Sequence, residues 1–229
     1  MIDIVLNNFP TADFALLIIL FLGAWEFWNP REKDKKNHLD NYILTSLYFL
    51  FFAFIIFITY YERLTPYFQD FRFQPLLILI LSFVVFFFIY KFFKLVFEKP
   101  KDIIKKYPSE YFLYMDNRYF FSKSSDIVFQ QVAIIAMVDM FKDAGMDLFL
   151  MIISFAVVFG LIHIPLVRTK GRDFGAYFIL AAIISAIFFP FLIIQFNYGF
   201  VYSFIIHWLF YIFSGMLFWI KYNFKSKSQ

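Results

Sequence analysis

The sequence predicts an all-α membrane protein: a polytopic transmembrane helical bundle of about seven spans, with the N-terminus outside and the C-terminus cytoplasmic. Of the 229 residues, 62% are hydrophobic, whereas soluble domains average roughly 45–50%. These residues fall in runs of about 15 to 22, the helix length that crosses a hydrocarbon core about 30 Å thick. The uneven distribution of lysine and arginine between alternate loops predicts the orientation.

Seven apolar segments have the length of a membrane span. The first has no basic residue before it and is followed by the charged stretch NPREKDKK, so we expect a retained span rather than a cleaved signal peptide. The predicted spans are Phe14–Trp28, Tyr42–Tyr60, Leu76–Phe97, Ile127–Phe141, Leu148–Val167, Phe174–Ile194 and Phe200–Ile220.

The basic residues concentrate on one side of these spans. Eighteen of the 21 lie in residues 29–41, 98–126, 168–173 and 221–229, or at the adjacent helix end with Lys91 and Lys94. The other three are Arg63, Arg72 and Lys142. Because cytoplasmic loops carry an excess of Lys and Arg, this split predicts a multi-pass protein of the cell membrane in the stated orientation. It also predicts contact with anionic membrane lipids, and it explains the net charge without a nucleic-acid partner.

The chain divides into three predicted regions. Residues 1–97 form three N-terminal transmembrane helices. Residues 98–126 form a cytoplasmic amphipathic linker that mixes lysine with Tyr and Phe, part of which, around Glu110–Phe121, is expected to lie along the membrane surface. Residues 127–229 form a four-helix core with a basic tail and hold most of the polar residues within spans.

Polar residues within spans are the candidate functional residues, because an ionisable group in the bilayer costs at least about 2.5–3.5 kcal/mol. Asp126 and Gln130 lie four residues apart and share a helix face, as do Phe159 and His163. His207 and Tyr211 have the same spacing in the last span. Imidazole near neutral pH binds metal or transfers protons, and a neighbouring carboxylate can act as a general base towards water. Buried hydrogen bonds between helices, worth about 1 kcal/mol each, are the structural alternative for each histidine.

These segments resemble the CPBP family, the CAAX-protease and bacteriocin-processing (Abi-type) intramembrane endopeptidases. FGLIH, residues 159–163, matches the second family motif, FxxxH. In GFVYSFIIHWLFY, His207 keeps the histidine of the third motif, HxxxN or HxxxD, but Tyr211 replaces its last residue. In SDIVFQQ the first motif, EExxFRG, is degenerate, because Ser125 and Asp126 replace the glutamate pair. The resemblance covers residues 120–215.

The resemblance implies a cavity between the last four helices in which a carboxylate and two histidines activate water for peptide-bond hydrolysis. Asp126, His163, His207 and Tyr211 would be the catalytic residues, with Tyr211 as donor to the developing oxyanion. Ser125 lacks the basicity of the glutamate that it replaces. No cofactor is required, although a divalent metal at His163 and His207 is possible chemistry. The expected partner is a peptide or membrane-protein substrate.

Two other functions fit the same residues. A catalytically inactive protein of this fold would bind a peptide or membrane partner in the cavity, since the glutamate pair, the arginine and the asparagine of the motifs are all replaced. Two intramembrane histidines also suit a bis-histidine haem or metal protein. The simple topology argues against a shared site for the two histidines, because it separates His163 and His207 by roughly 10–15 Å along the membrane normal. The absence of cysteine excludes thiol catalysis, disulfides and iron–sulfur clusters.

Overall fold

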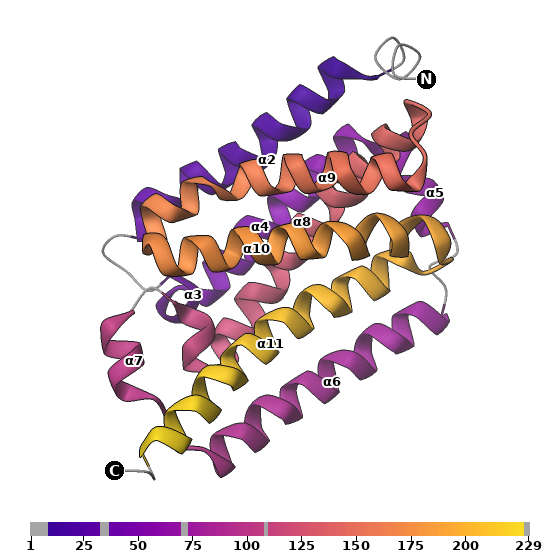
Figure 1. The fold of residues 1–229 in the computed structure, drawn as a ribbon. Helices are drawn as coiled ribbons and strands as arrows, with labels where there is room; N and C mark the ends of the chain where they lie inside the picture. Colours follow the sequence, from indigo (N-terminus) through magenta and orange to yellow (C-terminus); the bar gives the residue numbers. More distant parts are fainter. Residues whose placement is uncertain (1–8, 33–36, 70–72, 108–109, 227–229) are drawn as a thin grey trace.

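The computed structural model describes residues 9–32, 37–69, 73–107 and 110–226, and these residues are helical, with no strand among them. Figure 1 shows long helices packed side by side, with α2 at one side of the bundle and α6 at the other. The helices are α2 (Thr11–Glu32), α3 (Asn37–Asp40), α4 (Tyr42–Thr59), α5 (Tyr61–Phe68), α6 (Phe73–Val96), α7 (Lys101–Lys106), the 3₁₀ helix η1 (Tyr111–Tyr114), α8 (Asn117–Asp143), α9 (Leu148–His163), α10 (Pro165–Gln195) and α11 (Gly199–Ser226).

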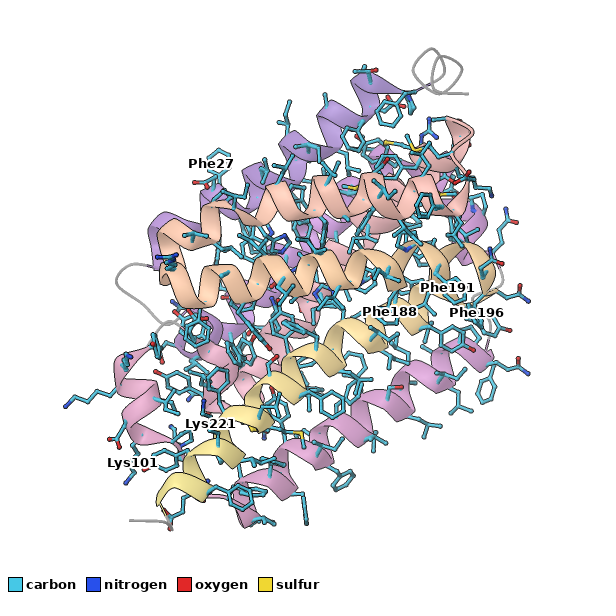
Figure 2. All side chains as sticks on the ribbon, in the orientation of Figure 1. Phe27, Lys101, Phe188, Phe191, Phe196 and Lys221 are labelled. Carbon is cyan, nitrogen blue, oxygen red and sulfur yellow. The ribbon has the colours of Figure 1, made fainter. Side chains whose placement is uncertain are left out.

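Within the described ranges, seven helices are long and apolar enough to cross a membrane, which confirms the predicted fold class. Large hydrophobic side chains cover their outer surfaces; Phe27, for example, is 76% exposed and projects away from α2 in Figure 2. Water would make such a surface unfavourable, whereas lipid chains are as apolar as the side chains themselves. The protein is therefore an integral membrane protein that crosses the bilayer several times.

Helix α8 lies at the centre of this bundle. It contacts α2, α4, α6, α9, α10 and α11, and 20 of its 27 residues are buried. Over its most apolar stretch the buried share is 89%, against 17–44% for the corresponding stretches of the other spans. Its apolar residues, among them Phe129 and Phe141, form much of the main hydrophobic core. A helix surrounded on all sides meets protein rather than lipid, so it is the one span that can carry many polar residues.

The region predicted as linker 98–126 differs from the structure. Its last ten residues belong to α8, which begins at Asn117 and not near Ile127. The segment around Glu110–Phe121 does not lie on the surface, because Tyr111–Tyr114 forms the buried η1. Trp219 Nε1 donates to the Leu113 carbonyl at 2.7 Å. Four consecutive large side chains have no polar face to present to water, and they pack against α11 instead.

The reversal between α9 and α10 falls where loop 168–173 is predicted, although α10 is helical from Pro165 onward. A Cβ on Gly175 would lie 2.4 Å from the Cα of Val167. Eight residues of straight helix would separate these positions by about 12 Å, so the chain folds back sharply between them. The fold brings α9 and α10 side by side (Figure 1).

Candidate functional site

The first turns of α8 bring a group of polar side chains into the bundle. Asp116 begins the helix by accepting a hydrogen bond from the Arg118 backbone N–H at 2.9 Å. Burial alone would raise the pKa of Asp116, but hydrogen bonds from Arg118 outweigh it and hold the pKa below its ordinary value. The buried polar residues that follow are Ser122, Lys123, Ser124, Ser125, Asp126, Gln130 and Gln131.

Asp126 is fully buried and pairs with two residues of its own helix. Lys123 Nζ lies 2.5 Å from Oδ2, and Gln130 Nε2 donates to Oδ1 at 2.9 Å. Both carboxylate oxygens therefore have a donor. The spacings of three and four residues place these side chains on one face of α8.

Lys123 connects Asp126 to Tyr211 on α11. Its Nζ lies 4.2 Å from the centre of the Tyr211 ring and interacts with the Tyr211 hydroxyl. It also lies 5.8 Å from the ring centre of Trp25 on α2. The face of an aromatic ring attracts a cation, most strongly away from water. Tyr211, predicted as the donor to an oxyanion, thus lies against an ammonium group.

His207 belongs to a second set of polar contacts between α8 and α11, formed with Gln131 and Ser203. Its Nδ1 lies 3.0 Å from Gln131 Nε2, and Gln131 Oε1 accepts from Ser203 Oγ at 2.9 Å. The His207 ring stacks on Tyr211 at 5.7 Å. The amide of Gln131 therefore joins two residues one turn apart on α11, which orients the imidazole.

His163 lies apart from this network. Its Nδ1 is 2.6 Å from the Phe159 carbonyl of its own helix, and its ring contacts Phe159 at 4.9 Å. Phe189 touches both Phe159 and His207, so aromatic rings connect the two histidines. The imidazoles interact electrostatically with each other and with Lys123. In the described part of the chain, no hydrogen bond joins Asp126 to either histidine.

The structure thus brings Asp126 and Tyr211 together through Lys123, and places His207 against Tyr211. Ser125, at the replaced glutamate, donates only to the Phe121 carbonyl at 3.4 Å. Sequence reasoning missed Lys123 and Ser203, and it did not predict the partners of Gln131. For Lys123 a signal was present, because a basic residue three positions before Asp126 is the spacing of a helical ion pair.

A second polar cluster ties the opposite end of α8 to its neighbours. Arg63 on α5 forms ion pairs with Asp139 at 3.3 Å, with Asp13 at 3.4 Å and with Asp143. Tyr67 donates to Asp139 at 2.9 Å, and burial followed by the Asp139 charge raises the pKa of Tyr67 well above its usual range. Asp139 is therefore held by side chains of α5.

The charged side chains do not form a metal site: among the described residues, no group of three or more histidine, aspartate or glutamate side chains lies close enough to hold an ion. Comparison of the chain with family models, curated proteins and solved structures found no match. The fold and composition define a multi-pass membrane protein with a polar centre formed by α8 and α11.

Proposed function

We propose that the chain is a catalytically inactive relative of the CPBP endopeptidases that binds a peptide or membrane-protein segment at its polar centre. The observation that supports this proposal is the engagement of both oxygens of Asp126, one by Lys123 and one by Gln130. A general base needs a lone pair directed at the water from which it takes a proton. An aspartate held by an ammonium group is a poor base, and no hydrogen bond joins it to a histidine among the described residues.

An unused donor beside the polar centre supports binding. The indole Nε1 of Trp25 is buried and has no hydrogen-bond partner in the described part of the chain, while its ring lies 5.8 Å from Lys123 Nζ. A buried donor without a partner costs about 1–3 kcal/mol. A carbonyl of a bound segment would satisfy it, and the cation of Lys123 would attract the same oxygen.

The test is a binding and cleavage assay with one membrane-tethered reporter peptide. We expect the purified wild type in detergent to bind the fluorescent reporter and release no fragment over hours. Replacing Trp25 with Phe should weaken binding about fivefold or more, since a hydrogen bond contributes about 1 kcal/mol. Trp219→Phe, whose indole donates to the Leu113 carbonyl, offers the matched control. Cleavage by the wild type, or equal binding by the Trp25 variant, would contradict the proposal.

The second candidate is an active intramembrane endopeptidase, which the unengaged Nε2 atoms of His163 and His207 favour. Both imidazoles engage only Nδ1 in hydrogen bonds to the described residues, which leaves each Nε2 for water or a substrate. In that case His163→Ala should abolish reporter cleavage. Cleavage at the same rate by wild type and variant would assign the activity to a contaminant.

A further inference from the structure

A hollow opens at the end of the bundle where α6 stops and the chain turns into α7. Its volume is about 580 Å³, and it is formed by residues 94–99 and Lys101 together with Tyr222 of α11. Figure 2 places Lys101 at this end of the molecule and Lys221 near it on α11.

The charge of the hollow is positive. Lys94, Lys99 and Lys101 line it, against the single carboxylate of Glu98. Within the described ranges, none of these lysines forms an ion pair with a carboxylate. Lys94 interacts only at longer range with Asp116, and Lys99 lies 5.0 Å from the centre of the Tyr114 ring. Three lysines against one glutamate leave the hollow with a net positive charge, which attracts an anion.

Apolar residues on the same hollow distinguish a lipid from a soluble anion. Leu95 is 85% exposed and Val96 is 55% exposed, and both lie at the end of a membrane-spanning helix. Tyr222 adds an aromatic ring of the kind enriched at the level of lipid headgroups. A ligand with a charged head and hydrocarbon chains would cover both kinds of surface.

The wall of the hollow is held in place by Asn223. Its Oδ1 accepts from the Glu98 backbone N–H at 3.0 Å, and its Nδ2 donates to the carbonyls of Glu98 at 3.0 Å and Trp219 at 2.8 Å. Phe97 stacks on Phe93 at 4.4 Å. A site formed in advance loses less conformational freedom when it binds.

We propose that this hollow binds the phosphate group of an anionic membrane lipid. Lys94, Lys99 and Lys101 contact the phosphate, and Leu95 and Val96 face the acyl chains. Basic pockets beside transmembrane helices bind acidic headgroups, with about 1 kcal/mol per lysine near the surface. The inference stands independently of the function proposed for the polar centre, which lies within the bundle.

The direct test measures binding of phosphatidylglycerol and of phosphatidylcholine with the same chains to the full-length protein, by native mass spectrometry from detergent. We expect the wild type to prefer phosphatidylglycerol. Each of Lys94→Gln, Lys99→Gln and Lys101→Gln should lower the affinity for this lipid by roughly fivefold, the factor that corresponds to about 1 kcal/mol per lysine. Lys142→Gln, at the opposite end, is the matched control and should bind as the wild type does. Equal binding of the two lipids, or no loss in the triple variant, would overturn the proposal.

Two further measurements use the wild type, and a third uses two variants of the positioning residue Asn223. Affinity for phosphatidylglycerol should fall as ionic strength rises, because a charged site near the surface is screened; an affinity independent of salt would refute it. Millimolar inorganic phosphate should not displace the lipid, whereas full displacement would assign the site to a soluble anion. Asn223→Ala should lower the affinity for phosphatidylglycerol although all three lysines are present. Asn223→Gln should bind phosphatidylglycerol as weakly as Asn223→Ala does.

Discussion

Lys123 and Asp126 form an ion pair inside the membrane-spanning bundle, with Nζ and Oδ2 2.5 Å apart and both side chains buried. Desolvating two charges costs several kcal/mol, and mutual attraction repays this only when further partners satisfy them. Gln130 donates a hydrogen bond to the other carboxylate oxygen of Asp126, and the ring of Tyr211 faces the ammonium group of Lys123. The pair carries no net charge, and both oxygens of its carboxylate are engaged, which limits what the polar centre can do.

The link between α8 and α11 gives a first prediction. Gln131 hydrogen-bonds both Ser203 and His207 across the interface, so Gln131→Leu should lower the free energy of unfolding by about 1–2 kcal/mol. Denaturant titration in mild detergent measures it. The same change at exposed Gln195 should have almost no effect. An unchanged free energy of unfolding for Gln131→Leu would show that the interface is held by apolar contacts alone.

Alanine substitutions at Gly215 and Gly23 distinguish the effect of close packing on stability from the effect of helix propensity. A Cβ on Gly215 would come within 2.9 Å of the Phe112 carbonyl oxygen, whereas one on Gly23 would meet nothing within 4 Å. Gly23→Ala should therefore stabilise the protein by up to about 1 kcal/mol. Gly215→Ala should destabilise it by about 1–3 kcal/mol, because η1 must move from α11. Thermal unfolding of both variants measures the difference, and similar shifts in Tm would refute the packing of η1.

The sequence sufficed for the seven spans because each depends on a continuous apolar run, which is a local property. It did not suffice for the start of α8. Residues 117–126 are polar enough to be a loop by composition, and they extend α8 because most of them are buried within the bundle. His207 and Tyr211 were found because their spacing is local. Predicting the ion pair of Asp126 would have required recognising that Lys123 belongs to the same helix.

Tyr60 provides a pH-dependent contact between α2 and α4. Its hydroxyl donates to the Asp13 carbonyl at 2.7 Å, and burial together with the Asp13 charge raises the pKa of Tyr60 to about 12. The unfolded chain releases this proton near pH 10, so the contribution to stability is complete below pH 10 and is lost as the pH rises to about 12. Wild type should lose stability over this range more steeply than Tyr60→Phe. Tyr61→Phe, at the exposed neighbour, should behave as wild type; parallel pH profiles for all three would contradict the assignment.

The predicted orientation can be tested directly because the chain has no cysteine. A single cysteine in place of Lys221 should react with a membrane-impermeant maleimide only after the cells are opened. One in place of Lys142 should react in intact cells. The excess of Lys and Arg on the Lys221 side is the physical reason, and the reverse labelling pattern would show that the N-terminus is cytoplasmic.

The double-mutant cycle of Lys123 and Asp126 tests the pair at the polar centre most directly. We expect Lys123→Met alone and Asp126→Leu alone each to cost about 3–5 kcal/mol, because each leaves a buried charge without its partner. The double variant should unfold with a free energy close to that of the wild type, so that the coupling energy exceeds about 2 kcal/mol. Additive losses, with a coupling energy near zero, would show that the two side chains do not pair and that Asp126 is free to act on water.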